Sequence, residues 1–295
     1  AEFDFVNRDA QTYNRVVTRK RDELEHAKAS HTVPRIVVPV HFSGQSCDMK
    51  EIYGLSKEYG FSIIEDASHA IGGKYLEQPV GCCQYSDITV FSFHPVKVMT
   101  TGEGGMVMTN NEELSQRLVE LRSHGISRDP ARMVDAKDEG GWYYQQLELG
   151  YNFRMTDIQA ALGLSQLQRL EEFLARRRSL AQRYNDKLTD LPLVTPWQNP
   201  DADSAWHLYV ICLQSGMIGI TRRQLYELMW QAEIGVNVHY IPVHLQPYYR
   251  DLGFGPGDYP EAEQYYNQAL TLPLFPGMSD ADQDKVVAVL HEALQ

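Results

Sequence analysis

The sequence of 295 residues has no long hydrophobic run and no excess of basic side chains. No apolar stretch approaches the roughly 20 residues that a membrane-spanning helix requires, so we expect no membrane partner. Lys and Arg number 27 against 39 Asp and Glu, which gives a net charge of −12. A protein that coats nucleic acid needs a basic stripe on its surface, so we expect no nucleic-acid partner. Hydrophobic residues make up 43% and charged residues 22%, which excludes a disordered chain.

Cysteine is also scarce. The four cysteines are Cys47, Cys82, Cys83 and Cys212. Their spacing matches no zinc site, and the two adjacent ones are poorly placed to bridge each other. The first five residues lack the basic start and the apolar stretch of a secretory signal. We therefore expect four reduced thiols, no metal and a cytoplasmic location.

The first half of the sequence alternates short β-rich runs with helical patterns. The predicted strands and helices, in chain order, cover residues 36–40, 49–59, 61–64, 88–93, 106–109 and 112–124. Strands that alternate with helices in this way are typical of an α/β fold. Because the strands read as buried, we expect a mostly parallel central sheet with helices on both faces.

The second half of the sequence has longer helical patterns. Apolar residues recur at helical spacing from Ile158 to Leu170, and the helix is predicted to continue to Leu188. The triple arginine at 176–178 is interpreted as a solvated face of this helix. Later elements are predicted at 207–213 (strand), 221–232 (helix), 236–241 (strand) and 279–294 (helix). We expect a large domain over residues 1–170 and a smaller C-terminal α+β domain over residues 171–295.

Two residues with complementary chemistry follow predicted strands. Asp66 lies at the carboxyl end of one strand, and Lys97 lies just past the end of another. Ligands of α/β sheets bind in the crevice outside the carboxyl ends of the strands. A lysine beside a carboxylate suits a Schiff base to pyridoxal phosphate, with the Asp paired to the pyridinium nitrogen. Taken singly, the Asp could cap a helix and the Lys could be a surface charge.

Longer motifs around these residues identify a family. The segments DASH (66–69), SFHPVK (92–97) and EGG (103–105) resemble the DegT/DnrJ/EryC1/StrS family of pyridoxal-phosphate-dependent sugar aminotransferases. Further similar segments are 121–126, 150–157, 239–244 and 272–276, so the resemblance covers nearly the whole chain. It implies the fold-type-I transferase architecture and the amination of keto-sugars attached to nucleotides.

Two segments look most like one branch of this family. They are Trp142-Tyr143-Tyr144 and HYIPVHLQPYYR (239–250). They resemble the UDP-4-amino-4,6-dideoxy-N-acetyl-β-L-altrosamine transaminases of pseudaminic acid biosynthesis. This likeness implies a UDP-linked 4-keto-6-deoxy sugar as substrate and glutamate as amino donor.

The resemblance also assigns roles around the cofactor. Lys97 matches the catalytic Schiff-base lysine, and Asp66 matches the partner of the pyridinium nitrogen. His69 matches a position, often Gln in relatives, near the cofactor ring and its phenolic oxygen. Ser92 matches the serine that hydrogen-bonds the cofactor phosphate. The plainer interpretations are a helix-face His69 with an ordinary hydrogen bond and a Ser92 that satisfies the backbone at a strand end.

Four further residues are assigned to a shared or substrate-facing part of the site. Asn152 matches a residue that reaches the cofactor phosphate of the neighbouring subunit, and Arg154 matches a nearby contact with anionic groups. Such borrowing implies a homodimer with shared active sites. His239 and Tyr240 are candidates for the sugar-nucleotide pocket. Alternatively, Arg154 forms an interface or surface salt bridge, and the two aromatic residues belong to the core of a strand.

One feature of the family has no counterpart in the sequence. Family members begin with a segment that carries a Gly-Thr turn for the cofactor phosphate and an aromatic residue stacked on the cofactor ring. No Gly-Thr turn precedes Asp66, and the first 45 residues contain a single glycine, Gly44. We therefore expect an N-terminally truncated family member. A non-catalytic or inactive binding or assembly protein remains the alternative to an aminotransferase.

Overall fold

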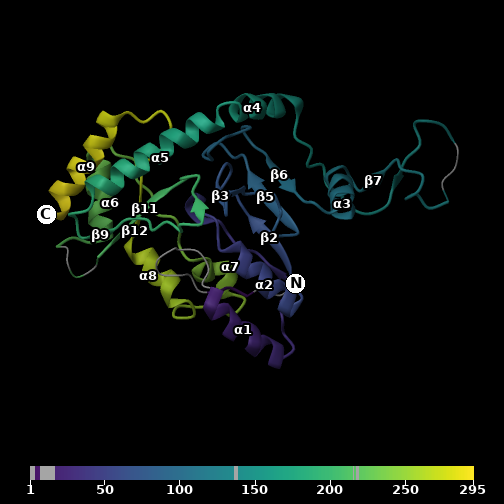
Figure 1. The fold of residues 1–295 in the computed structure, drawn as a ribbon, viewed down its shortest axis with the longest axis horizontal. Coiled ribbons are helices and arrows are strands. Elements are labelled where there is room, and N and C mark those ends of the chain that lie inside the picture. Colours follow the sequence, from purple (N-terminus) through teal and green to yellow (C-terminus); the bar gives the residue numbers. More distant parts are fainter. Residues whose placement is uncertain (1–3, 7–16, 136–138, 215, 217–218) are drawn as a thin grey trace.

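The computed structural model describes residues 4–6, 17–135, 139–214, 216 and 219–295 of the chain. Figure 1 shows these residues as strands and helices arranged around two main sheets. None of the helices in this part of the chain is both long and apolar enough to cross a membrane. All four cysteines are free.

The first main sheet has the strand order β1-β2-β5-β6. β1 (Ile36–Val37) and β5 (Ile88–Ser92) both pair in parallel with β2 (Ser62–Asp66). β6 (Gly105–Met108) pairs antiparallel with β5 at the edge. The predicted mostly parallel sheet is thus confirmed.

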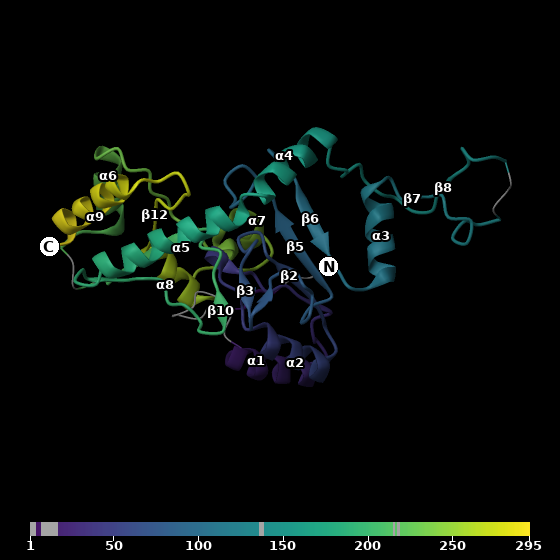
Figure 2. The same ribbon diagram turned by 45° about the horizontal axis from the view of Figure 1, so that its top comes forward.

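Helices cover both faces of this sheet. Figure 2 shows α1 (Val17–Ala29) and α2 (Met49–Tyr59) on one side of the strands, with α4 (Asp157–Leu167) and the start of α5 (Leu170–Lys187) on the other. The apolar face of α2 is buried against β2 because its hydrophobic residues recur at helical spacing. The α/β class that the sequence predicts is confirmed.

The second main sheet is antiparallel and lies toward the C-terminal end of the molecule. Its order is β12-β11-β9, from β12 (Ala269–Leu272), β11 (Tyr209–Leu213) and β9 (Leu193–Val194). Every residue of β11 and β12 is buried. Side chains of α5, α6 (Arg222–Gln231) and α9 (Asp280–Leu294) join them in the largest hydrophobic cluster of the described residues.

The remaining elements are short or lie at the periphery. They are β3 (Lys74–Tyr75), β4 (Gln78–Pro79), α3 (Glu112–Arg122), β7 (Ile126–Ser127), β8 (Gln145–Gln146), β10 (Ala202–Asp203), α7 (Pro247–Arg250) and α8 (Pro260–Gln268), with 3-10 turns at Phe42–Gly44 and Val243–Leu245.

The strand predicted over residues 236–241 is wrong. Asn237 makes only an isolated bridge with Thr271, which belongs to β12. The indole of Trp230 donates to the Val236 carbonyl, and Pro242 has no N–H to give to a ladder. The sequence did not predict β12, because a run of four residues is too short for its periodicity to distinguish a strand from a helix.

The predicted long helix is also divided. It breaks at residues 168–169 into α4 and α5. Gly163 is the only buried residue of α4, and its apolar side chains face outward, with Ile158 84% and Leu164 64% exposed. The helical spacing is therefore real, but in α4 it marks an exposed apolar face.

The triple arginine is not a solvated face. Arg177 is only 4% exposed. Arg178 binds Asp203, and Arg176 binds Asp280 and the carbonyl of Met278. The prediction failed because consecutive helical residues point in different directions, so one of the three must face the core.

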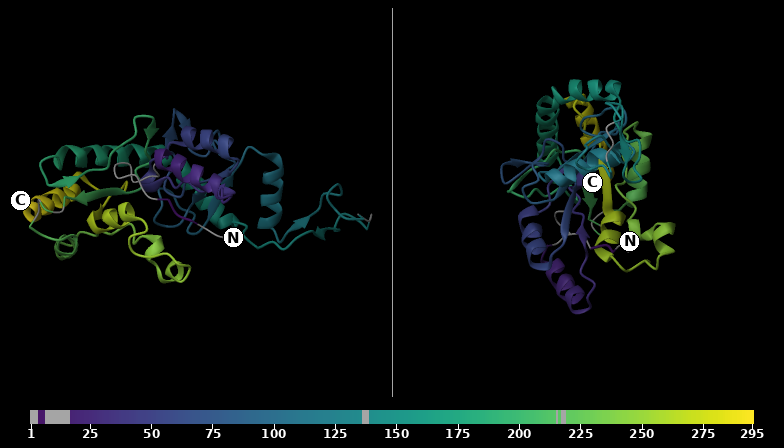
Figure 3. Two further views of the ribbon diagram at one scale, coloured as in Figure 1. Left: turned by 90° about the horizontal axis from the view of Figure 1, so that it is seen from below. Right: turned by 90° about the vertical axis from the view of Figure 1, so that its right-hand side faces the viewer.

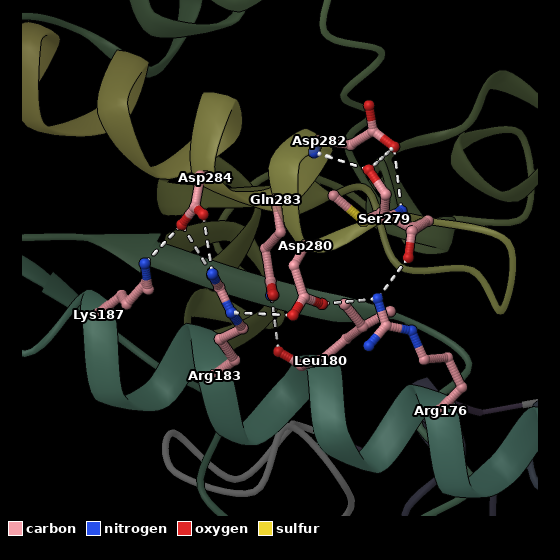
Figure 4. Close-up of polar contacts among 10 residues, drawn as sticks. Arg176, Leu180, Arg183, Lys187, Ser279, Asp280, Asp282, Gln283 and Asp284 are labelled. Atoms are coloured by element: carbon pink, nitrogen blue, oxygen red, sulfur yellow. Dashed lines mark hydrogen bonds and ion pairs between the residues drawn. The ribbon is translucent and has the colours of Figure 1, made fainter.

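Ion pairs join α5 to α9 (Figure 4). Arg183 makes two hydrogen bonds of 2.8 Å to Asp284, and Lys187 binds the same carboxylate. Between these charges, Gln283 is fully buried and donates to the Leu180 carbonyl at 2.7 Å. The two helices are held together by polar contacts at the rim and apolar contacts beneath.

A buried carboxylate lies under the first sheet. Glu65 of β2 is 5% exposed and accepts hydrogen bonds from His41 at 2.7 Å, from Thr89 at 2.9 Å and from Ser86. The Cys47 N–H donates to Nδ1 of His41, so the opposite ring nitrogen carries the proton shared with Glu65. Burial alone would raise the pKa of Glu65, but the hydrogen bonds from His41, Ser86 and Thr89 hold this pKa below its ordinary value.

We predict that Glu65→Gln destabilises the fold at neutral pH. An amide in place of the carboxylate points N–H groups at neighbouring donors, which costs about 3 kcal/mol of unfolding free energy. Since the pKa of Glu65 is lowered on folding, its contribution is present above the carboxyl range and is lost as the pH falls. Urea denaturation followed by circular dichroism should therefore show a gap between wild type and variant at pH 7 that narrows in acid.

Glu58→Gln is the matched control, because Glu58 is exposed and pairs with Arg21 at 3.1 Å. Its loss should change the unfolding free energy by less than about 1 kcal/mol. Equal denaturation midpoints for Glu65→Gln and wild type at pH 7 would contradict the stabilising role of the buried carboxylate.

Candidate active site

Asp66 and Lys97 meet at one edge of the first sheet. Asp66 ends β2 opposite Val90 of β5, and Lys97 lies in the turn after β5, where its N–H bonds to the His94 carbonyl. Parallel strands place their carboxyl ends at the same edge. The Asp66 carboxylate consequently lies close enough to favour the charged form of the Lys97 amine.

Both side chains have polar atoms that lack a hydrogen-bond partner among the described residues. Lys97 is half-buried, and its amine makes no hydrogen bond or ion pair with any residue that the structure describes. One oxygen of Asp66 accepts from the Ser68 N–H at 3.0 Å, and no described residue donates to the other. Burial lowers the pKa of Lys97 below its ordinary value, while Asp66 opposes this shift. A free carboxylate oxygen beside a reactive amine fits the donor set that pyridoxal phosphate requires.

His69 lies beside this pair with its ring fixed from one side. It is 7% exposed, and its Nδ1 accepts from the Ser43 N–H at 3.3 Å. Burial and the positive charge of Lys97 lower the pKa of His69 to about 3, although Asp66 opposes this. The imidazole is therefore neutral, with its proton on Nε2, which has no partner in the described part of the chain.

Ser92 ends β5 at the same edge. Its side-chain oxygen lies 3.5 Å from the His94 N–H and can accept from it. The hydroxyl proton has no acceptor among the described residues, so it remains available to an anionic group.

His239 and Tyr240 come to the site from the second half of the chain. His239 Nδ1 lies 2.8 Å from the Thr271 hydroxyl, and its carbonyl accepts from Tyr265. Burial lowers the pKa of His239, with the Lys97 charge adding to this. Burial and the Asp66 charge raise the pKa of Tyr240. The two residues thus belong to the same electrostatic neighbourhood as Asp66 and Lys97, although they do not form a strand.

Asn152 and Arg154 follow the region of α3, β7 and β8 along the chain. Asn152 pairs with Ser123 just after α3, and both Asn152 and Arg154 are exposed. Figures 1 and 3 show that the arm, residues 126–135 and 139–153 with β7 and β8, projects away from the body beyond α3. Arg154 makes no ion pair with any described residue. No hydrogen bond or ion pair among the described residues joins Asn152 or Arg154 to Asp66, Ser92 or Lys97.

The sequence pattern did not predict His207 as a site residue. This residue is 6% exposed and its ring centroid lies 4.4 Å from that of His69. Burial lowers the pKa of His207 far below its ordinary value, and the nearby charges of Lys97 and Arg177 act in the same direction. Its position before β11 carries no local motif, so only the fold brings it to His69. Despite these three imidazoles, the described residues hold no group of ligands arranged to bind a metal.

We predict that the Lys97 amine reacts at lower pH than exposed lysines. Its pKa is lowered by burial, so trace acetylation followed by peptide mass spectrometry should give a midpoint below that of exposed lysines such as Lys74 in the same digest. Asp66→Asn should lower the midpoint further, because it removes the charge that favours the ammonium form.

Asp201→Asn, an exposed aspartate, is the control and should leave the Lys97 midpoint unchanged. A Lys97 midpoint at or above that of Lys74 would contradict the buried environment described above.

The chain matches the DegT/DnrJ/EryC1/StrS aminotransferase family over residues 1–291. It is 41% identical over 285 residues to the uncharacterized protein MJ1066 of Methanocaldococcus jannaschii, covering 96% of this chain and 71% of the relative. It is also 41% identical over 276 residues to the spore coat polysaccharide biosynthesis protein SpsC of Bacillus subtilis, covering 92% of this chain and 69% of SpsC.

Solved structures give the same result. PseC of Helicobacter pylori, an aminotransferase involved in pseudaminic acid biosynthesis, superposes with a TM-score of 0.86 at 26% identity, covering 99% of this chain and 73% of PseC. The pyridoxamine-phosphate form of Spr1654, a putative sugar aminotransferase of Streptococcus pneumoniae, gives 0.84 at 29% identity, covering 98% and 75%. The chain therefore belongs to the DegT/DnrJ/EryC1/StrS family of sugar aminotransferases, whose cofactor is pyridoxal phosphate.

Proposed function

We propose that this chain transfers an amino group from glutamate to the 4-keto carbon of a UDP-linked 4-keto-6-deoxy sugar. The observation that carries the proposal is the half-buried amine of Lys97 beside the open carboxylate oxygen of Asp66 at the strand-end edge. The likeness to PseC, which acts in pseudaminic acid biosynthesis, and to SpsC, a polysaccharide biosynthesis protein, supports the sugar substrate. The predicted cytoplasmic location suits such a substrate and stays a prediction.

The division of the chain supports the placement of this site. We propose that residues 1–170 form the cofactor-binding domain and residues 171–295 the smaller domain. Each part has one main sheet and one main hydrophobic cluster, while the sheet β10-β3-β4 and two smaller clusters join residues of both parts. Asp66 and Lys97 come from the first part and Tyr240 from the second, so the site lies where the two meet.

The roles of the residues follow from their surroundings. Pyridoxal phosphate, when bound, supplies an aldehyde that takes up an amino group and a ring that accepts electrons. Asp66 would pair with the ring nitrogen, and Ser92 would donate to the phosphate. Lys97 would hold the aldehyde carbon and, once released, move a proton to and from the amino donor at Nζ. Its lowered pKa leaves a larger neutral fraction than an exposed lysine has.

His69, His239 and Tyr240 would frame the reacting groups. Neutral imidazoles donate and accept hydrogen bonds without adding charge, and the Tyr240 hydroxyl stays protonated because its pKa is raised. Such groups can orient sugar hydroxyls. We propose that His239 and Tyr240 contact the sugar nucleotide.

The exposed apolar side chains favour a homodimer. Trp142, Leu149 and Phe153 of the arm are 74%, 82% and 71% exposed, and Ile158 of α4 is 84% exposed. Apolar surface of this extent marks an interaction site. We propose that the arm packs on a second copy, so that Asn152 and Arg154 of one subunit reach the cofactor phosphate and substrate held by the other.

The first test is covalent capture of the cofactor. Pyridoxal phosphate added to the protein and reduced with borohydride should label Lys97, as located by peptide mass spectrometry. Lys97→Ala should remove the label and lower amino transfer on the order of 10⁴-fold or more, whereas Lys74→Ala should do neither. Adding glutamate before borohydride should protect Lys97 from the label, because the donor displaces it.

Three results would overturn parts of the proposal. Absence of any label on wild type would favour a non-catalytic binding protein. A label without protection by glutamate would exclude glutamate as donor, with the cofactor site intact. Failure to convert a UDP-linked 4-keto sugar, detected as a missing aminated product, would exclude that substrate alone.

The second test is complementation between inactive variants. In mixtures of Lys97→Ala with Arg154→Ala, each mixed dimer holds one intact site, so about a quarter of the wild-type rate should return. The matched control is a mixture of Lys97→Ala with Asp66→Asn. One chain supplies both residues to its site, so each site of a mixed dimer lacks one of them and activity should not return. Equal failure of both mixtures would contradict the shared site.

A further inference from the structure

Two buried imidazole rings pack against each other at a tilted angle next to the candidate active site. The rings of His69 and His207 are 4.4 Å apart between centroids and inclined by 44°. Both residues are less than a tenth exposed. They come from distant parts of the sequence, since His69 follows β2 and His207 precedes β11.

His69 depends on this packing for its orientation. Its only hydrogen bond from the described residues is the 3.3 Å bond from the Ser43 N–H to Nδ1. A single long bond restrains one ring atom and leaves the ring free to tilt. The ring of His207 lies 4.4 Å away between centroids and limits this tilt.

His207 is itself held through its backbone. Arg177 Nη1 donates to the carbonyls of His207 at 3.2 Å and Trp206 at 3.1 Å. On the other side, the Leu208 N–H bonds to the Ser43 carbonyl at 3.2 Å. The same turn, 42–44, thus anchors both histidines, His69 through the Ser43 N–H and His207 through the Ser43 carbonyl.

The approach of these segments leaves no room for a side chain at position 44. Gly44 has a φ of +107°, and a Cβ there would lie 2.8 Å from the Trp206 N and 3.0 Å from the His207 N. Arg177 is a buried cation for which the described residues provide carbonyl oxygens and no carboxylate. Burial lowers the pKa of Arg177 to about 10, so it remains charged at neutral pH and opposes protonation of His207.

A nitrogen of His207 is left without a partner. Its Nδ1 is buried and makes no hydrogen bond with any described residue. The ring of His207, rather than this nitrogen, makes the 4.4 Å contact with His69 beside Lys97.

We propose that His207 is a positioning residue of the amino-transfer site: Arg177 anchors its backbone, and its ring holds His69 so that the Nε2–H of His69 faces the bound cofactor. The inference rests on the proposed function for its consequence but not for its geometry. His207 itself does not touch the reacting atoms.

The first experiment uses the protein without added cofactor. Nitrogen-15 histidine spectra should show His69 in wild type as the tautomer with its proton on Nε2, with the signals assigned by comparison with His69→Gln. In His207→Ala the two His69 nitrogen signals should move toward each other, because the ring exchanges between tautomers. His207→Phe keeps a flat ring and should restore the wild-type signals.

The second experiment measures cofactor affinity. His207→Ala should weaken pyridoxal phosphate binding on the order of tenfold, as expected for a misplaced donor. His207→Phe should stay within about threefold of wild type, and Arg177→Met should fall between them. His31→Ala, which removes an exposed histidine, is the control for charge and composition. If His207→Ala does not fold, His207→Asn removes the ring with a smaller change in volume and replaces it.

The outcomes separate the two proposals. Unchanged His69 signals and unchanged affinity in His207→Ala would overturn the positioning role. Altered signals with no cofactor binding in wild type would support the positioning geometry and contradict the proposed function. A loss in His207→Phe equal to that in His207→Ala would also overturn the inference, because the nitrogens rather than the ring would then matter.

Discussion

The parallel pairing of β2 with β5 is the constraint on which the site depends. Consecutive residues of a strand face opposite sides of the sheet, so Glu65 and Asp66 point in opposite directions. Glu65 is tied to Thr89 of β5 and to His41 beneath the sheet. Asp66 is thereby presented at the strand-end edge, where the turn after β5 brings Lys97. Glu65, which stabilises the sheet, and Asp66, which would pair with Lys97 in the reaction, therefore lie on opposite faces of the same strand.

The sequence predicted the parts of the site that follow strands and missed the parts that depend on tertiary packing. Asp66 and Lys97 were found because a strand end can be recognised from its apolar run, and parallel strands end at one edge. His207 and Arg177 have no such local sign. Arg177 was interpreted as solvated because a run of three arginines is usually a surface feature, yet it is buried against the Trp206 and His207 carbonyls.

The same limit explains the errors in the predicted secondary structure. The spacing of apolar residues predicted α2, β2 and β5, since buried residues recur along each at the expected period. It failed for β12, whose run is only four residues long, and for residues 236–241, where Asn237 alone pairs with β12. It also could not show that the apolar residues of α4 face outward. Exposure depends on the partner that covers a helix, and spacing alone does not identify that partner.

The distribution of charge connects these observations to the anionic ligands of the proposed reaction. A chain with a net charge of −12 must attract a phosphate and a nucleotide diphosphate with few cations. Within one chain the positive charges near His207 are Lys97 and the buried Arg177, and the histidines around them are neutral. Protonating those imidazoles would place like charges together in a region of low dielectric, which is costly. Neutral rings can donate hydrogen bonds to an anion without lowering the pKa of Lys97 further. In the proposed homodimer, Arg154 of the second subunit would add charge that one subunit lacks, so dimer formation and ligand attraction would become the same requirement.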